Sequence, residues 1–238
     1  MNIALIGYGK MGKAIEEIAL HRGHNIPLKI DIDTIGQFTK ENLAKVDVAI
    51  EFTGPHSAYD NVKKLMQFGV RTVCGSTGWI DKLPEIEEEC KKSNAAFIYA
   101  SNFSVGVNIF FEVNKRLASL MKQHDDYEIQ LAEIHHTQKK DAPSGTAITL
   151  AEQVLENIPR KKKWVNNISD NPEELEILSE RIDPAAGTHK VKYSSAVDDI
   201  EIIHTAHTRK GFALGAMLAA EFLKGKKGVY TMKDVLSL

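Results

Sequence analysis

The sequence predicts an α/β protein, with a doubly wound parallel sheet followed by a smaller mixed α/β domain. In the first hundred residues, short apolar runs alternate with stretches of helical periodicity, which indicates a parallel sheet covered on both faces. After about residue 103 the pattern changes to a long helix and then to strands of alternating polarity, typical of a largely antiparallel or mixed sheet. The length of 238 residues suits one large domain or two small ones.

The first half of the chain supplies the strands of the expected parallel sheet. They are the short apolar runs at residues 2–6, 28–32, 47–52, 72–74 and 96–99. Between these runs the apolar side chains recur at helical spacing. Helices are therefore expected around residues 11–19, 62–70 and 83–90.

The boundary to the second domain is expected near Asn102. Ser144 precedes a helical stripe of apolar residues and is the candidate N-cap of that helix. The expected elements beyond the boundary are a helix at 105–121, a strand at 127–136, a helix at 144–157, a loop at 160–184, strands at 191–197 and 200–207, and an apolar helix at 212–223.

Charge and cysteine content argue against several classes of protein. Lys and Arg number 30 and Asp and Glu 32, giving a net charge of −2, which argues against nucleic acid as the partner. Cys74 and Cys90 are the only cysteines and form no disulfide framework, which favours a reducing cytoplasm. The opening residues contain no basic region or cleavage site, so no secretory leader is expected. No apolar run approaches the roughly 18 residues of a membrane helix, so no membrane partner is expected.

A glycine-rich motif follows the first expected strand and opens the first expected helix. It reads Gly7, Tyr8, Gly9, Lys10, Met11, Gly12, a complete G-x-G-x-x-G. Such glycines permit a tight turn and a close backbone approach to a pyrophosphate, which the helix N-terminus then binds. Asp31 lies 19 residues beyond Gly12, where a carboxylate would accept hydrogen bonds from a ribose diol. The motif therefore predicts a dinucleotide cofactor.

Two other interpretations concern glycine-rich loops. Residues 7–13 also fit the phosphate loop G-x-x-x-x-G-K, but that motif needs a hydroxyl next and position 14 is Ala14, which cannot ligate Mg²⁺. Residues 75–78, with the sequence Gly-Ser-Thr-Gly, follow the fourth expected strand. The carboxyl end of a strand is where an open parallel sheet binds its ligand, although a plain turn explains this loop equally well.

The second chemistry-bearing segment runs from a strand end through a polar loop into a helix N-terminus. It gathers imidazoles, an ammonium group, hydroxyls and free N–H groups at His135, His136, Lys139, Ser144, Gly145 and Thr146. This combination suits a small dianionic acid, and an imidazole supplies a proton carrier. His135 and His136 are adjacent on a strand, so their side chains face opposite sides. His204 and His207 lie three residues apart on another expected strand and also face opposite sides. Neither pair is therefore expected to bind a metal ion.

These segments together resemble the bacterial 4-hydroxy-tetrahydrodipicolinate reductases of lysine and diaminopimelate biosynthesis. The similarity rests on residues 7–12, 75–78, 100–108, 133–146 and 209–236, with 135–146 as the most specific part. It implies an N-terminal Rossmann-type dinucleotide-binding domain over 1–103, rejoined by 212–238. It also implies a substrate-binding and oligomerisation domain over 104–211, whose sheets pack into a homotetramer.

The resemblance also implies roles for individual residues. His135 is similar to the family's proton donor/acceptor and Lys139 to its proton donor, and substrate contacts are implied for His136, Lys139, Gly145 and Thr146, with Ser144 beside them. The implied contacts to the nicotinamide cofactor are Gly7, Tyr8, Gly9, Lys10, Met11, Gly12, Asp31, Gly75, Ser76, Thr77, Ala100, Ser101, Asn102 and Phe103.

Three departures from the family pattern bear on these roles. Ile32 replaces an Arg that many relatives have, and Asp31 stands where Glu is usual, so NADH is favoured over NADPH. The loop reads Thr-Gln-Lys-Lys at 137–140, which leaves Lys139 and Lys140 as alternatives, with spacing favouring Lys139.

The expected activity is an NAD(P)H-dependent reduction of a small cyclic dicarboxylate, with a hinge near Asn102. The alternatives are a nucleotide-binding regulatory module without turnover and another Rossmann oxidoreductase such as an aspartate dehydrogenase.

Overall fold

The computed structural model describes all residues from 1 to 238 and contains two compact units. The first unit comprises Met1–Val105 and Arg209–Leu238, and the second comprises Gly106–Thr208. None of the helices combines the length and apolar character that crossing a membrane requires.

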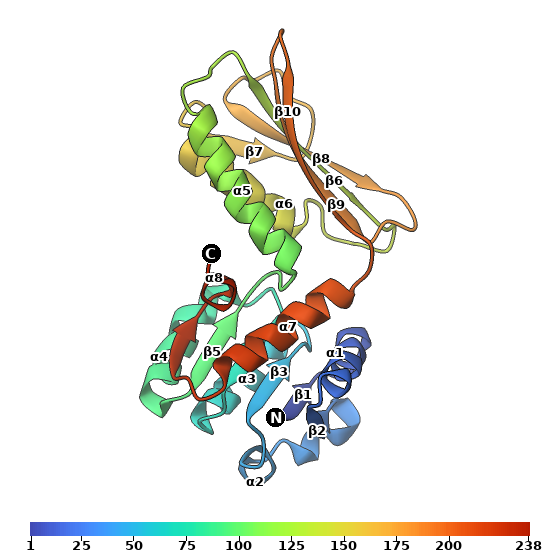
Figure 1. The fold of residues 1–238 in the computed structure, drawn as a ribbon, viewed down its shortest axis with the longest axis vertical. Coiled ribbons are helices and arrows are strands. Elements are labelled where there is room, and N and C mark those ends of the chain that lie inside the picture. Colours follow the sequence, from blue (N-terminus) through green and yellow to red (C-terminus); the bar gives the residue numbers. More distant parts are fainter. The chain divides into compact units, whose positions relative to one another are not determined.

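The first unit is built on a six-stranded parallel sheet with the order β11-β5-β4-β3-β1-β2 (Figure 1). This confirms the predicted Rossmann-type sheet. Chain order reverses at β1, which pairs with both β2 and β3, so the loop after β1 lies at the point where open parallel sheets bind ligands. The strands are β1 (Asn2–Ile6), β2 (Asn25–Ile30), β3 (Val48–Glu51), β4 (Thr72–Cys74), β5 (Ala96–Tyr99) and β11 (Gly228–Tyr230).

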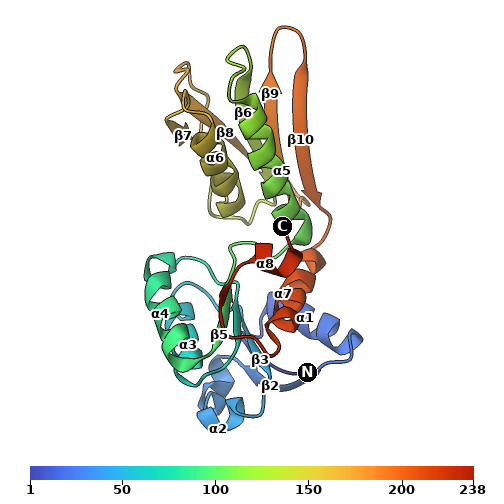
Figure 2. The same cartoon turned by 60° about the vertical axis from the view of Figure 1, so that its left-hand side comes forward.

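Helices cover both faces of this sheet (Figure 2). One face packs on α3 (Ala58–Gln67) and α4 (Leu83–Ser93), while α1 (Lys10–His21), α7 (Lys210–Leu223) and α8 (Met232–Leu236) pack on the other. Successive residues of β1 therefore enter different cores, and every residue from position 3 to position 6 is buried. Burial on both faces is why this strand is a continuous apolar run. A short helix, α2 (Lys40–Leu43), precedes β3.

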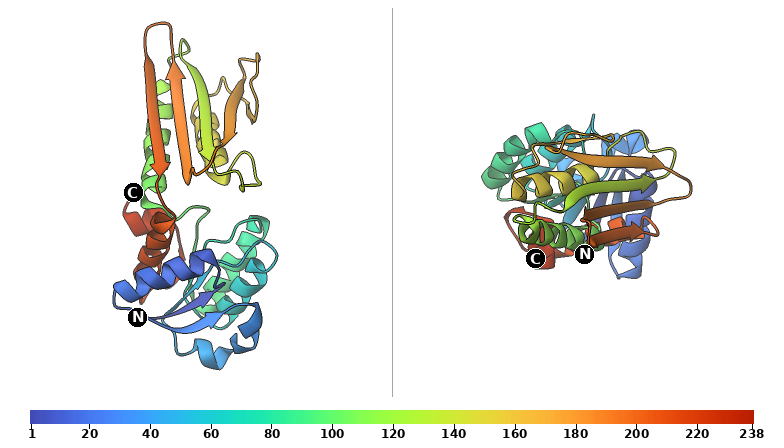
Figure 3. Two further views of the ribbon diagram at one scale, coloured as in Figure 1. Left: turned by 90° about the vertical axis from the view of Figure 1, so that its right-hand side faces the viewer. Right: turned by 90° about the horizontal axis from the view of Figure 1, so that it is seen from above.

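The second unit is built on a five-stranded mixed sheet with the order β10-β9-β6-β8-β7. β6 pairs antiparallel with β9 and parallel with β8, which confirms the predicted mixed sheet. Helices α5 (Val105–Met121) and α6 (Gly145–Asn157) pack on one face, and the other face carries no helix of this unit (Figure 3). The strands are β6 (Glu128–His135), β7 (Lys163–Val165), β8 (Glu174–Arg181), β9 (Gly187–Ser194) and β10 (Asp199–Ala206).

The prediction of a loop over residues 160–184 is wrong, because this segment contains β7 and β8. In β8 the buried side chains are Leu175 and Ile177, and charged glutamates alternate with them. The run of acidic residues obscured this alternation. β8 also lies between β6 and β7, and pairing on both sides stabilises a strand whose composition is poor in β-forming residues.

Three further features differ from the sequence prediction. β2 spans Asn25–Ile30 rather than residues 28–32, because Asp31 ends the strand and caps a 3₁₀ helix that begins at Ile32. β9 begins at Gly187 rather than at residue 191, because His189 is a buried member of the alternating face that Val191 and Tyr193 continue. At the chain's end, β11 pairs with β5 at the edge of the first sheet, and α8 follows it. Three residues of β11 are too few to show a period in the sequence.

We expect Ile177→Ala to destabilise the protein by about 2–5 kcal/mol, because it leaves a cavity between β8 and the helices. Thermal unfolding followed by circular dichroism measures the effect. Ile168→Ala is the matched control, since Ile168 lies in the same segment and is 74% exposed. Equal effects of the two substitutions would show that residues 174–181 do not form a core strand.

Candidate functional site

The glycine loop after β1 leaves no room for side chains at two of its positions. Gly7 has φ of +93°, and a Cβ there would overlap the carbonyl oxygen of Phe52. A Cβ at Gly12 would overlap the carbonyl oxygen of Gly7. These two glycines therefore allow α1 to pack directly against the end of β1.

The N-terminus of α1 has the properties of an anion site. Gly9 is the N-cap, no side chain caps this end, and the first turn contains no acidic residue. A Cβ at Gly9 would meet no atom within 4 Å, so the space above the loop is open. The N–H groups of this turn and the helix dipole favour a phosphate group there.

Asp31 lies at the end of β2, where it caps a 3₁₀ helix. Its carboxylate accepts hydrogen bonds from the N–H groups of Tyr8, at 3.0 Å, and Ile32, at 2.8 Å. A carboxylate has further lone pairs, which a ribose diol can use. The adjoining cleft has a volume of about 440 Å³ and is lined by Ile6, Gly7, Tyr8, Gly9, Ile30, Asp31, Ile32, Ile35, Phe52, Thr53, Ser57 and Asn61.

Six of the other predicted cofactor residues line a second cleft of the same unit, whereas Gly12, Ser76, Thr77 and Ala100 line neither cleft. This cleft of about 280 Å³ is lined by Lys10, Met11, Phe52, Gly75, Ser101, Asn102, Phe103, Arg209 and Phe212. Phe52 borders both clefts. Ser76 is buried, Thr77 is exposed, and Ala100 packs against the core beneath the loop.

The second unit contains a buried carboxylate at the end of β6. Glu133 is 0% exposed and accepts hydrogen bonds from the N–H of Ser144 at 3.1 Å, the hydroxyl of Ser179 at 2.8 Å and the guanidinium of Arg181 at 3.1 Å. Burial raises the pKa of Glu133, but these donors and the nearby His135 outweigh burial and lower the pKa below its ordinary value. Glu133 is therefore ionised.

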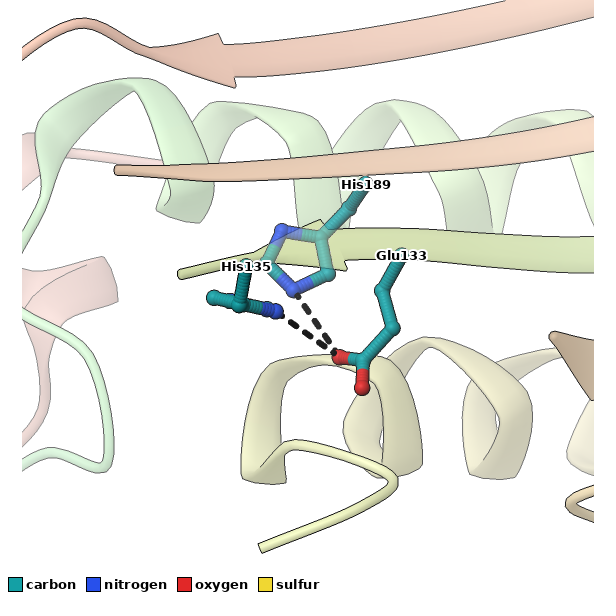
Figure 4. A group of neighbouring side chains, drawn as sticks. All are labelled: Glu133, His135 and His189. Atoms are coloured by element: carbon teal, nitrogen blue, oxygen red, sulfur yellow. Dashed lines mark ion pairs between the residues drawn. The ribbon is translucent and has the colours of Figure 1, made fainter. Parts of the chain in front are cut away.

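Two imidazoles lie beside this carboxylate (Figure 4). The Oε2 atom of Glu133 is 3.5 Å from Nδ1 of His135 and 3.7 Å from Nε2 of His189. Burial lowers the pKa of His135, and Glu133 opposes that effect. Burial lowers the pKa of His189 to about 3, so this ring is neutral at physiological pH.

Lys139 lies in the loop after β6 and is held by an ion pair. Its ammonium group contacts both carboxylate oxygens of Asp141, at 2.8 Å and 2.7 Å. Burial raises the pKa of Asp141, but the bond to Lys139 contributes to a net lowering of the pKa. Lys140 is exposed. The same loop is fastened by Arg181, which donates to the backbone oxygen of Asp141.

Ser144, at the start of α6, forms hydrogen bonds with members of the cluster. The Ser144 hydroxyl accepts a hydrogen bond from the N–H of Ala147, as the predicted N-cap does, and lies 3.1 Å from Nε2 of His189. Its own N–H donates to Glu133. Ser144 is 3% exposed, whereas Gly145 is exposed and Thr146 is half-buried at this helix end.

The structure thus brings His135, Lys139 and Ser144 into one cluster, and His136 follows directly on His135. Sequence reasoning missed three members of the cluster: Glu133, Arg181 and His189. The signal for His189 is its place in the alternating buried face of β9. Arg181 lay in the segment mistaken for a loop, and Glu133 in a strand where its neighbours are apolar.

Glu133, His135 and His189 present three ligand atoms within 4.8 Å of one another, a spacing that invites comparison with a metal site. The carboxylate, however, is already bonded to three donors, one of them the guanidinium of Arg181. A divalent cation between Oε2 and the two imidazoles would lie close to the guanidinium of Arg181, which would repel it. The donor set fits an imidazole–carboxylate cluster better than a cation.

The parallel sheet, the glycine loop and the carboxylate after β2 define the class: a Rossmann-type dinucleotide-binding protein, whose second unit carries a cluster of ionisable side chains. Residues 1–103 match the family described as "Dihydrodipicolinate reductase, N-terminus". Residues 106–236 match "Dihydrodipicolinate reductase, C-terminus". The chain belongs to the dihydrodipicolinate reductase family.

Curated relatives and solved structures agree with this assignment. The 4-hydroxy-tetrahydrodipicolinate reductase of Christiangramia forsetii is 50% identical over 237 residues, covering 100% of this chain and 98% of that protein. The enzyme of the same name from Methanocaldococcus jannaschii is 36% identical, covering 98% of this chain and 81% of that protein. A dipicolinate-bound dihydrodipicolinate reductase from Paenisporosarcina has the same fold, with a TM-score of 0.75, 22% identity and 97% coverage of both chains.

An aspartate dehydrogenase from Thermotoga maritima shares the fold more distantly, with a TM-score of 0.51 and 15% identity, covering 94% of this chain and 97% of that protein. The family assignment therefore does not favour the aspartate dehydrogenase alternative.

We expect Gly9→Ala and Gly12→Ala to have different effects, because only position 12 is enclosed by backbone. Gly12→Ala should lower the melting temperature, whereas Gly9→Ala should leave it within about 1–2 °C of the wild type. Gly9→Ala should nevertheless weaken NADH binding, measured by fluorescence titration, because its methyl group occupies the open space above the helix N-terminus. Unchanged NADH affinity in Gly9→Ala would contradict a pyrophosphate site at this loop.

Proposed function

We propose that the chain catalyses the NAD(P)H-dependent reduction of 4-hydroxy-tetrahydrodipicolinate to tetrahydrodipicolinate, in the biosynthesis of lysine and diaminopimelate. The observation that carries this proposal is the cluster of Glu133, His135 and Lys139 beside the N-terminus of α6, in a chain whose two halves both match this reductase family. The cluster offers proton carriers and a cation, which are the groups that reduction of a dicarboxylate requires.

The first unit is proposed to bind the cofactor, over residues 1–103 rejoined by 212–238. Its open glycine loop, the uncapped α1 N-terminus and Asp31 fit a dinucleotide, with Gly7 to Gly12 against the pyrophosphate and Asp31 on a ribose. When bound, the nicotinamide supplies a hydride. Residues 75–77 and 100–103 are proposed as further contacts, since Gly75, Ser101, Asn102 and Phe103 line the second cleft.

The second unit, over residues 104–211, is proposed to hold the substrate. The reaction adds a hydride and a proton to the substrate and releases its 4-hydroxyl group as water, so the enzyme must supply one proton. His135 is the proposed donor, assisted by Lys139. The substrate's carboxylates would bind to His136, to Lys139 in exchange for Asp141, and to the N–H groups of Gly145 and Thr146.

Self-association into a homotetramer is proposed through the open face of the β6–β10 sheet. That face carries cross-strand ion pairs, between Lys190 and Glu201 and between Lys192 and Asp199, and the apolar side chain of Ile203, which is 56% exposed. A sheet face without a covering helix is suited to packing against a second copy of the chain.

We expect His135→Gln to lower kcat by about 10²–10⁴-fold with a much smaller change in KM, because the variant retains shape but carries no exchangeable acid. Absorbance at 340 nm with pyruvate, aspartate semialdehyde and the preceding synthase measures the rate. Lys140→Met is the matched control for this loop region and should retain activity. Cofactor binding without any turnover in the wild type would instead indicate a regulatory module.

We expect NADH to be preferred over NADPH by up to about tenfold in kcat/KM, or roughly 1.4 kcal/mol at most. None of the residues lining the Asp31 cleft is a cation, so a 2′-phosphate would lie near the carboxylate without a counter-charge. Lys29 is paired with Glu16, and Lys10 lines the other cleft. Comparing kcat/KM for both cofactors tests this, and Ile32→Arg should move the ratio toward NADPH. A wild-type NADPH preference that disappears in Lys10→Ala would assign the phosphate to Lys10.

A further inference from the structure

Glu133 carries a fixed negative charge inside the second unit. Such a charge persists only where hydrogen bonds replace hydration. The donors come from both sides of β6: Ser179 and Arg181 from β8, and the N–H of Ser144 from the start of α6. The lowered pKa of Glu133 agrees with this environment.

The arrangement of these donors leaves one edge of the carboxylate directed at the imidazoles. Ser179 and Arg181 both bind Oε1, at 2.8 Å and 3.1 Å. The N–H of Ser144 is shared between the two oxygens, at 3.1 Å from each, and is the only one of these donors that reaches Oε2. Oε2 faces Nδ1 of His135 at 3.5 Å, and that nitrogen is buried without a hydrogen-bond partner (Figure 4). At 3.5 Å the two atoms are slightly too far apart for a hydrogen bond while the ring is neutral. When the ring is charged, attraction to Glu133 would draw Nδ1 closer and a charge-assisted hydrogen bond would form.

His189 does not compete with His135 for this charge. Its Nε2 atom lies 3.1 Å from the hydroxyl of Ser144, nearer than the 3.7 Å that separates it from Glu133. The ring is 5% exposed and packs edge-on against His135, with ring centroids 5.0 Å apart. His189 is therefore a neutral, buried ring that packs against His135 and carries no charge of its own.

The opposite edge of the His135 ring lies beside a glycine. A Cβ at Gly187 would be 3.2 Å from Nε2 and 3.3 Å from Cδ2 of His135. Any other residue at position 187 would crowd this edge. The two nitrogens of His135 are thus distinct: Nδ1 faces a buried carboxylate, and Nε2 lies on the edge that Gly187 keeps clear.

We propose that Glu133 is a positioning residue for His135 in the reaction proposed above. It holds a proton on Nδ1, stabilises the imidazolium form against burial and directs proton exchange to Nε2. In this scheme the imidazolium gives its Nε2 proton to the reduced substrate, and the neutral ring keeps its Nδ1–H toward Glu133. The neutral ring is the resting state, because burial lowers the pKa of His135, and Nε2 regains a proton from solvent when the next substrate binds. The proposal rests on His135 being the acid of the proposed function.

The test is Glu133→Gln, read first by NMR titration of ¹³C-labelled histidine in the whole enzyme without substrate. The midpoint of His135 should fall by about one pH unit or more, because the variant removes the opposite charge. In the pH profile of kcat, a rate that needs protonated His135 is present below its pKa and is lost as pH rises through it. The loss should therefore move to lower pH, with kcat at pH 7 reduced at least tenfold and KM for NADH unchanged.

Glu128→Gln is the matched control, since Glu128 begins the same strand and its side chain is 68% exposed. It should leave both the titration and kcat unchanged. If Glu133→Gln does not fold, Glu133→Asp carries the test, because it keeps the charge but withdraws it by one methylene, and the His135 midpoint should again fall.

Three results would overturn the proposal. An unchanged His135 midpoint would remove the electrostatic role, and a loss of kcat equal at every pH would indicate a purely structural role. Inactivation of the wild type by a chelator, reversed by Zn²⁺, would make Glu133 and His189 metal ligands instead. If His135→Gln keeps its activity while the titration still shifts in Glu133→Gln, it is the proposed acid role of His135 that fails.

Discussion

Keeping one charged carboxylate inside the second unit is the constraint on which the rest of the site depends. Removing an ionised carboxylate from water is costly unless donors replace its hydration. Glu133 obtains those donors from β8 and from the start of α6. The position of α6 therefore depends on the register in which β6 pairs with β8. The loop between β6 and α6 is therefore held at both ends, and this loop carries Lys139 and the segment from His136 to Asp141.

The site is the polar end of a face that is otherwise apolar core. Along β6 the buried positions pass from Ile129 and Leu131 to Glu133 and His135. Along β9 they pass from Tyr193 and Val191 to His189 in the opposite direction. Because the strands are antiparallel, the polar ends meet at the same end of this strand pair, inside the sheet. The same period-2 burial that builds the core thus assembles the cluster, with no additional element.

The sequence predicted most of the first unit because local patterns there are decisive: the central strands β1, β3, β4 and β5 are buried on both faces, and the glycine motif occurs at the end of β1. In the second unit it predicted the α5 helix and the Ser144 cap from local periodicity. It could not identify β8 as a strand, nor Glu133 and His189 as partners. These features depend on pairing between segments about 50 residues apart, and only the fold shows that a buried charge has been satisfied.

The ionised groups of the cluster cancel one another. Glu133 and Asp141 carry two negative charges, while Lys139 and Arg181 carry two positive ones, and His135 is neutral because burial lowers its pKa. The arrival of the proposed dianionic substrate would upset this balance. Its carboxylates would compete with Asp141 for Lys139 and would favour a proton on His135, since nearby negative charge stabilises the imidazolium. Before the substrate binds, His135 would thus be unprotonated. Substrate binding itself would favour uptake of the proton that the reduction consumes.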